Sequence, residues 1–322
     1  MNIFWKLSLS LPTIKSRKQN IHRMKAVVYE QNGGPEVLRL VEIEKPIPKE
    51  GEVLIHVAGA TYNPVDAAIR SGVFPIPVAL PAIPGSEASG VVEALGAGVE
   101  NVAVGDKVIV ELLPAQGGAA EYICAPATHV VAAPKTMDLA DAAGVPLVCQ
   151  TAWQGLFVHA KVEQGQRVLV VGAGGAVGGV AVQMAHQAGA YVVATASGDD
   201  VERVKTLGAD EVIDYKKAIV ADAISAPVDA AVVFAPANLA PYYPTVKAGG
   251  RLVSAASPAD DAPQTIEVIR LFGQNDPALL AKIVALVDAG QLTVPIGFRG
   301  SIEDVPAIHA NPPHAGKAIF RI

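Results

Sequence analysis

The sequence has only two cysteines, Cys124 and Cys149, among its 322 residues. Neither a disulfide framework nor a four-thiolate zinc site can form within one chain, because each needs more thiols. Free cysteine is among the most buried residue types, so we interpret both as small core residues. None of the seven histidines is paired with a second ligand at metal-site spacing. The sequence therefore predicts no metal.

Aromatic and charged residues are also scarce, at 5% and 17%, whereas hydrophobic residues make up 51%. The net charge is −6 and no basic stripe is present in the part expected to fold, which argues against nucleic acid as a partner. No apolar run approaches the ~20 uncharged residues that span a bilayer, so we expect no stable membrane insertion. This composition, with 30 glycines and 24 prolines, is typical of a compact α/β enzyme with aliphatic cores.

Residues 1–23 form a basic N-terminal extension with five Lys or Arg and no Asp or Glu. Such a composition occurs in organelle transit peptides and also in tails without a targeting role. Lys6 and Pro12 interrupt its apolar part, which weakens a secretory interpretation. We expect a cytoplasmic protein, or a mitochondrial one if this extension is a transit peptide.

The remaining chain has the length of two domains. Residues 24–146 show short alternating segments separated by Gly and Pro turns, the pattern of a β-barrel-like domain. Residues 147–285 alternate apolar strands with helices, which predicts a doubly wound parallel sheet, and residues 286–322 are expected to complete the first domain. In the second domain we predict helices at 150–160, 177–188 and 201–207, and strands at 167–171, 191–196, 211–215, 230–235 and 251–255.

A glycine-rich turn joins an apolar strand to a helix in RVLVVGAGGAVGGVAVQMAHQAGAYVVATAS, residues 167–197. A dinucleotide diphosphate needs such a turn, because it must approach backbone amides at a helix N-terminus without Cβ obstruction. The spacing departs from G-x-G-x-x-G, since three residues separate Gly174 from Gly178. We expect the cofactor to contact Gly172, Gly174, Gly175, Val177 and Gly178.

The choice of nicotinamide nucleotide is decided at the end of the second strand, which reads Thr-Ala-Ser-Gly at 195–198. An enzyme specific for NAD usually has an acid there for the ribose 2′-hydroxyl. Its absence favours NADPH, with Ser197 as a hydroxyl donor and Arg203 or Lys205 as cations. Asp199 and Asp200 argue the other way and keep NADH open.

Several further motifs lie on either side of this turn, namely Asn63-Pro64-Val65-Asp66, Gly85-Ser86-Glu87, Gly105-Asp106-Lys107-Val108, Leu207-Gly208-Ala209-Asp210 and Gly316-Lys317. In their order and spacing they resemble the medium-chain dehydrogenase/reductase superfamily and, within it, the zinc-independent quinone oxidoreductase (ζ-crystallin-like) group. The resemblance covers nearly all of residues 24–322. It implies a GroES-like β-barrel catalytic domain, a Rossmann domain, a cleft between them and, as often in this group, a homodimer.

The resemblance also implies roles for single residues. Asn63 would contact the nicotinamide ribose or the substrate, Asp66 would line the cleft, and Thr151 would approach the nicotinamide. Tyr215 would pack near a 2′-phosphate. Simpler interpretations stay open, namely a turn residue for Asn63, a helix cap for Asp66 and a strand-end aromatic for Tyr215.

Two departures from related patterns bear on the reaction. The zinc-dependent relatives have a histidine ligand where this chain has Ser86, which disfavours zinc-dependent alcohol oxidation. Many quinone oxidoreductases have a Thr-Tyr pair where this chain has Ala67-Ala68, which leaves the proton donor unidentified. The resemblance implies hydride transfer from NADPH to a quinone or an α,β-unsaturated carbonyl. An enoyl-thioester reductase and a nucleotide-binding interaction protein with little catalysis remain alternatives.

Overall fold

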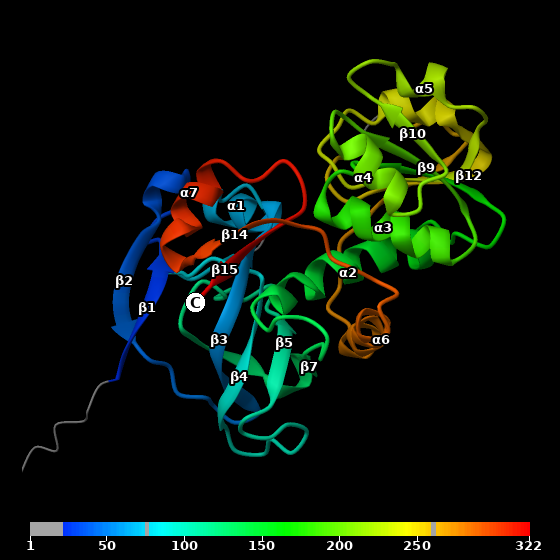
Figure 1. The fold of residues 1–322 in the computed structure, drawn as a ribbon. Coiled ribbons are helices and arrows are strands. Elements are labelled where there is room, and N and C mark those ends of the chain that lie inside the picture. The colour runs from blue at the N-terminus through cyan, green and yellow to red at the C-terminus, as the bar shows by residue number, and fades with distance from the viewer. Residues whose placement is uncertain (1–21, 75–76, 259–261) are drawn as a thin grey trace, which may run out of the picture.

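The computed structural model describes residues 22–74, 77–258 and 262–322. Most of the basic extension and part of the 73–77 loop therefore lie outside the described residues. The chain folds around two large sheets, which form two lobes joined at helix α2 (Pro146–Trp153) (Figure 1).

A six-stranded parallel sheet forms the lobe of the second half of the chain, with the strand order β10-β9-β8-β11-β12-β13. Helices α3 and α4 follow the first two strands, as the alternating pattern predicts, and the doubly wound fold is confirmed. The elements are β8 (Arg167–Val171), α3 (Ala176–Gln187), β9 (Tyr191–Ala196), α4 (Asp200–Thr206), β10 (Glu211–Asp214), α5 (Val220–Ala223), β11 (Val228–Val233), β12 (Val246–Ser254) and β13 (Glu267–Arg270).

Strand β8 explains why an uninterrupted apolar segment belongs in the middle of such a sheet. Val168 and Val170 pack into a core that includes α2, α3 and α6 (Pro277–Asp288), while Leu169 and Val171 pack into a second core on the opposite face. Successive side chains of a strand point to opposite faces, so burial on both sides requires apolar residues throughout. The edge strand β13 is only half-buried, and sequence analysis missed it.

A seven-stranded sheet forms the other lobe, in the order β14-β15-β3-β4-β5-β7, with β6 also paired to β3. Strand β15, near the C-terminus, pairs antiparallel with β3 of the first half of the chain. A separate hairpin of β1 and β2 lies beside it. The elements are β1 (Arg23–Val28), β2 (Arg39–Glu44), β3 (Glu52–Tyr62), α1 (Pro64–Ser71), β4 (Glu87–Leu95), β5 (Lys107–Glu111), β6 (Tyr122–Pro126), β7 (Val130–Ala132), β14 (Ile296–Ser301), α7 (Val305–Ala310) and β15 (Lys317–Arg321).

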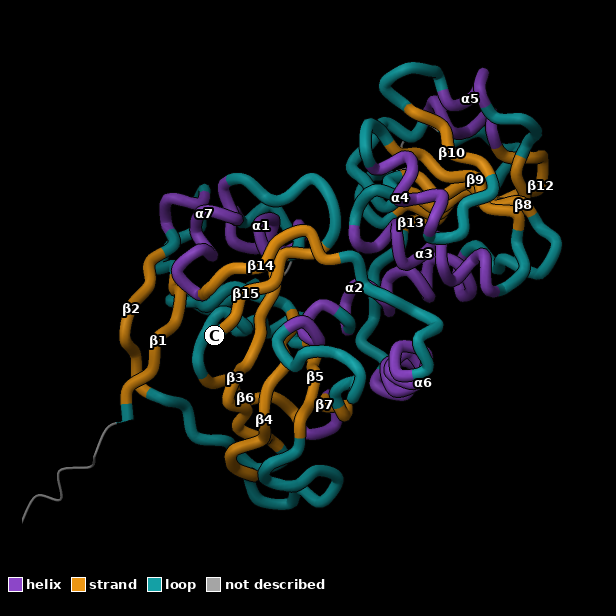
Figure 2. Tube along the Cα trace, viewed as in Figure 1, coloured by secondary structure: helices purple, strands orange, loops and turns teal. Residues whose placement is uncertain are grey.

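Helix α2 connects the two lobes (Figure 2) and continues as a π-helical turn over Gln154–His159. It contacts β5 of the first lobe and both α3 and α6 of the second. The predicted helix at 150–160 corresponds to this continuous segment. The domain boundaries at 146 and 285 stay a prediction.

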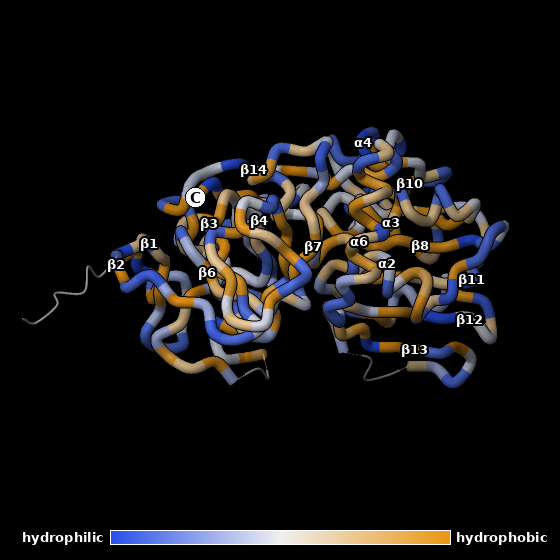
Figure 3. Tube along the Cα trace, turned by 90° about the horizontal axis from the view of Figure 1, so that it is seen from below, coloured by the Kyte–Doolittle hydropathy of each residue, from blue (hydrophilic) through white to orange (hydrophobic). Residues whose placement is uncertain are grey.

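Both cores are aliphatic, as the low aromatic content predicts, and apolar residues gather along interior elements such as α3 and α6 (Figure 3). Cys149 is fully buried, whereas Cys124 is half-buried. Burial raises the pKa of both thiols, that of Cys124 to about 11, so both stay protonated at neutral pH. Within the described ranges no helix is long and apolar enough to cross a bilayer.

Candidate active site

A cavity of about 570 Å³ lies where the two lobes meet. The glycine turn after β8, the ends of β9 and β3, and the segment that leads from α7 into β15 all contribute to its wall. The structure brings most of the predicted site residues together here: Asn63, Gly172, Gly174, Gly175, Val177, Gly178, Ser197 and Tyr215 all line the cavity. Asp66, Thr151 and Arg203 do not.

The glycine turn has the shape of a diphosphate cradle. Gly172 has a φ of +84°, a conformation that favours glycine. A Cβ on Gly178 would lie 2.2 Å from the carbonyl oxygen of Gly172, so the helix can approach the turn only without a side chain there. Gly175 is the N-cap of α3 and makes no side-chain cap, so no capping side chain stands between an anion and the first N–H groups of the helix.

The backbone at Gly175, unlike that at Gly178, has room for a side chain. A Cβ on this residue would meet only the carbonyl oxygen of Gly172, at 3.4 Å. The turn therefore tolerates a side chain here, and the glycine leaves room on the cavity side. These residues fit a dinucleotide diphosphate.

The other end of the cavity wall is polar. The hydroxyl of Ser197 donates to the hydroxyl of Tyr215 at 3.2 Å. Arg203 lies behind this wall, where its Nε and Nη2 donate to Asp200 Oδ1 at 3.1 and 2.8 Å, and its Nη2 donates to the Gly174 carbonyl at 2.6 Å. Its buried Nη1 has no hydrogen-bond partner among the described residues. Asp200, which sequence analysis used only as an argument for NADH, lines the cavity.

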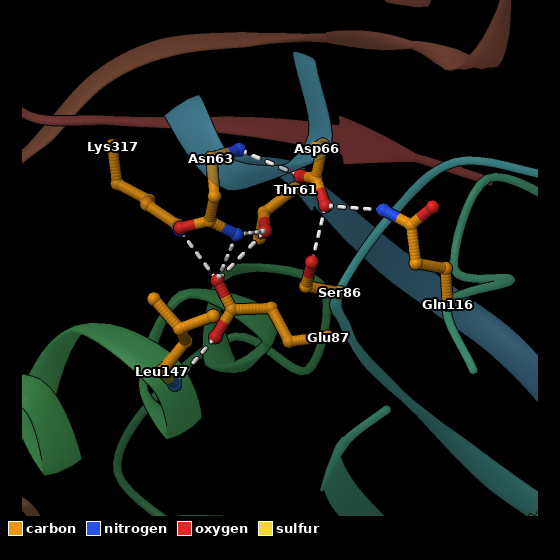
Figure 4. Close-up of polar contacts among 8 residues, drawn as sticks. All are labelled: Thr61, Asn63, Asp66, Ser86, Glu87, Gln116, Leu147 and Lys317. Atoms are coloured by element: carbon orange, nitrogen blue, oxygen red, sulfur yellow. Dashed lines mark hydrogen bonds and ion pairs between the residues drawn. The ribbon is translucent and has the colours of Figure 1, made fainter. Parts of the chain in front are cut away.

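Asn63 belongs to a buried polar network that links four segments of the chain (Figure 4). Its Nδ2 donates to Thr61 Oγ1 at 3.2 Å and to Glu87 Oε1 at 3.1 Å, and its Oδ1 accepts from the ammonium of Lys317. Glu87, from β4, also accepts from the Thr61 hydroxyl at 2.8 Å and from the Leu147 N–H of α2 at 2.7 Å. The network thus ties the first lobe to α2.

Asp66 differs from its expected place in the cleft. It is fully buried beneath the start of α1, where Oδ2 accepts from the Asn63 N–H at 2.8 Å and Oδ1 accepts from Ser86 and Gln116. The open alternative, a helix cap, describes this position. Burial raises the pKa of Asp66 to about 6, although the hydrogen bonds from Ser86 and Asn63 lower it.

Thr151 also lies away from the cavity. It belongs to α2, yet the residue of that helix that lines the cavity is Val148, one turn earlier. Sequence analysis missed Glu87 and Lys317 as functional residues, although it quoted both within family motifs. Each is a charged residue that begins a strand and is directly followed by small or apolar residues, which the structure buries. That contrast in the sequence was the available signal.

A second buried carboxyl group, that of Glu111, lies beside the network. Glu87 and Glu111 are cross-strand partners on β4 and β5. Burial, and then the charge of Glu87, raise the pKa of Glu111 to about 7. Its Oε2 accepts from Gln150 Nε2 at 2.7 Å, which connects it to α2. Nowhere in the described part of the chain do three His, Cys, Asp or Glu side chains gather as a metal site would require.

Comparison with known proteins matches both lobes to family models. Residues 49–135 match the alcohol dehydrogenase GroES-like domain, and residues 176–283 match the zinc-binding dehydrogenase model. The human quinone oxidoreductase is 32% identical over 315 residues, which cover 92% of this chain and 95% of that protein. The chain belongs to the quinone oxidoreductase family of medium-chain dehydrogenases/reductases.

Two further members of this family are similar. The NADPH-dependent alkenal/one oxidoreductase of Arabidopsis thaliana chloroplasts is 41% identical over 210 residues, which are 62% of this chain and 54% of that protein. This match thus spans about half the length of the plant relative. The solved structure of the quinone oxidoreductase from Coxiella burnetii has 30% sequence identity and a TM-score of 0.86, and covers 94% of this chain and 100% of that one. The predicted GroES-like and Rossmann architecture is confirmed.

Proposed function

We propose that this quinone oxidoreductase family member is an NADPH-dependent reductase of quinones or α,β-unsaturated carbonyls. The observation that carries the proposal is the meeting of a diphosphate cradle with the Asn63 network in one cavity between the lobes. Relatives named as quinone and alkenal/one oxidoreductases support both acceptor classes.

The residues divide the work along the cavity. The N–H groups at the start of α3 would hold the diphosphate, and Asn63 would lie at the nicotinamide end. NADPH bound there would supply a hydride to the acceptor. Apolar residues such as Val148 and Ala318 line the same cavity and would exclude water from the reacting atoms.

Preference for NADPH over NADH rests on the polar wall around Ser197. The Tyr215 hydroxyl, which accepts from Ser197, would donate to a 2′-phosphate, and Ser197 would give up its hydrogen bond to Tyr215 to donate to the same phosphate. Arg203 adds positive charge close behind them, although Asp200 neutralises part of it. The name of the Arabidopsis relative supports the same cofactor.

We also propose catalysis without zinc. The ammonium of Lys317 lies 2.5 Å from Glu87 Oε1, and the residue before Glu87 in the sequence is Ser86, where the zinc-dependent relatives have a histidine ligand. A fixed cation at this place disfavours a divalent cation beside it, because like charges repel strongly where little water screens them.

A cytoplasmic homodimer is proposed for the assembly. Strand β13 ends the order of the six-stranded sheet, and an edge strand can pair with a second copy of the chain. Light scattering should give twice the chain mass of 33.2 kDa. A mass of one chain would contradict the dimer, and mitochondrial fractionation of the tagged full-length protein would favour the transit-peptide alternative.

The test of function is cofactor binding and oxidation by the purified protein, with chelator present throughout. We expect NADPH oxidation with 1,4-benzoquinone, 9,10-phenanthrenequinone or a 2-alkenal, and slower oxidation of NADH. Tight NADPH binding without turnover on any acceptor would refute the reductase and favour the interaction protein. Turnover that chelator abolishes would refute the zinc-free mechanism.

A further inference from the structure

Lys317 is a buried cation at the wall of the cavity. Its side chain is 2% exposed, and of the described residues that line this cavity it is the one Lys or Arg. The Gly316 backbone beside it bridges to Gly175 of the diphosphate cradle. The ammonium therefore lies close to where the cofactor turn and the Asn63 network meet.

The hydrogen bonds of Asn63 limit what that residue can do. Its two Nδ2 hydrogens are used by Thr61 and Glu87, and its Oδ1 accepts from Lys317. The amide orientation is fixed, because the carbonyl faces the cation and the NH₂ group faces the carboxylate. Asn63 can thus accept a hydrogen bond from a ligand, and it has no free N–H to donate to one.

Lys317 has the opposite capacity. An ammonium carries three N–H donors, and among the residues that the structure describes Glu87 and Asn63 take up two of them. Glu87 is in turn held by the Thr61 hydroxyl and the Leu147 N–H, so the cation is anchored from β4 and α2. One N–H of a rigidly placed cation remains for a ligand in the cavity.

The proposed reaction needs such a donor. When a hydride forms a new C–H bond at the β-carbon of an enone, the π pair of the C=C bond moves between the α-carbon and the carbonyl carbon. The C=O pair then moves onto oxygen, which becomes negative, until a proton from water adds to the α-carbon. A preorganised donor aimed at the oxygen where charge develops lowers the barrier more than one aimed at the reactant.

We propose that the Lys317 ammonium is the catalytic hydrogen-bond donor that stabilises the negative oxygen of the reduced acceptor. This inference rests on the proposed reductase function. It assigns a hydrogen-bond donor to a chain that has Ala67-Ala68 in place of the Thr-Tyr pair. Glu87 is the positioning residue that holds the ammonium, and Asn63 keeps it oriented toward the cavity.

The test uses the full-length protein, one double variant and one control variant. Lys317→Met alone would strand the buried Glu87 carboxylate, so the test variant is Lys317→Met/Glu87→Gln, which removes both charges and leaves no buried charge without its partner. Lys247→Met is the matched control, because Lys247 is half-exposed, pairs with Asp229 and does not line the cavity. We expect it to behave as the unaltered protein does.

The first readout compares two acceptors. A 2-alkenal passes through a poorly stabilised enolate, whereas an electron-poor quinone gives an anion that is stable in water. Loss of one oxyanion donor costs about 10²–10³-fold in other enzymes. We expect a loss of that size in kcat with the alkenal and about tenfold or less with the quinone. Equal losses with both would show a structural role and overturn the proposal.

The second readout is independent of turnover. 4-Nitrophenol, whose phenolate absorbs visible light, is titrated against the protein with NADP⁺ bound. We expect the unaltered protein to lower the pKa of the bound phenol and the double variant not to, while both bind NADPH with the same Kd. An unchanged phenol pKa in the two proteins would refute the proposal, whereas failure of the unaltered protein to reduce any acceptor would refute the proposed function instead.

Discussion

Two glycines of the same turn should respond differently to substitution by alanine: Gly178→Ala should lower the stability of the fold, and Gly175→Ala should weaken NADPH binding. At Gly178 a Cβ would lie 2.2 Å from the Gly172 carbonyl oxygen, 2.7 Å from its carbonyl carbon and 2.8 Å from Ala173 Cα. All three are backbone atoms, which cannot rotate away as a side chain does. Gly178→Ala therefore forces α3 and the turn apart.

The cost follows from two opposing effects. Overpacking costs roughly 1–3 kcal/mol, and this contact with backbone belongs near the upper end. Alanine inside a helix regains up to about 1 kcal/mol over glycine. The net loss is about 2 kcal/mol, which lowers the melting temperature by roughly 4–8 °C if each kcal/mol shifts it by about 2–4 °C.

Gly175→Ala is the matched change. Gly175 has a φ of −79°, and its Cβ would meet nothing closer than 3.4 Å, so stability should change by less than about 0.5 kcal/mol. The new methyl group stands where the diphosphate would approach, and we expect the NADPH Kd to rise at least about tenfold. Thermal unfolding and fluorescence titration measure the two quantities. An unchanged melting temperature for Gly178→Ala, or unchanged NADPH affinity for Gly175→Ala, would refute the reasoning.

Three other predictions concern the carboxyl groups and the metal. Asp200→Asn removes a negative charge from the cavity wall and should improve NADPH affinity relative to NADH about tenfold, as two Kd titrations would reveal. Glu111 has a pKa raised from 4.5 to about 7 in the fold, so its contribution to stability is full below pH 4.5 and is lost as the pH rises through 7. At roughly 1.4 kcal/mol per unit, the natural chain should lose about 3 kcal/mol more than Glu111→Gln between pH 4.5 and 8 in urea unfolding; parallel curves would contradict this. Prolonged chelation should leave NADPH oxidation unchanged, and recovery of lost activity by added zinc alone would argue against Lys317 as the charge-stabilising group.

The sequence by itself determined the architecture of the second lobe. The strand at 167–171 and the helix that follows could be predicted because apolar periodicity and glycine turns act within a few residues. The same local logic located the diphosphate cradle, since Gly172 and Gly178 are needed by a single turn and the helix after it. Strand β13 was missed because its half-buried edge position leaves no strong pattern.

Only the tertiary structure decided which polar residues face the cavity. Lys317 meets Asn63 across 254 positions of the sequence, and Glu87 meets the Leu147 N–H across 60. Asp66 lies only three residues from Asn63, yet the start of α1 turns it into the protein interior. No local pattern encodes such neighbours, because the pairing of β15 with β3 and the approach of α2 to β4 create them together. A motif thus predicts which residues are functional candidates, and the packing of distant strands determines which of them share a site.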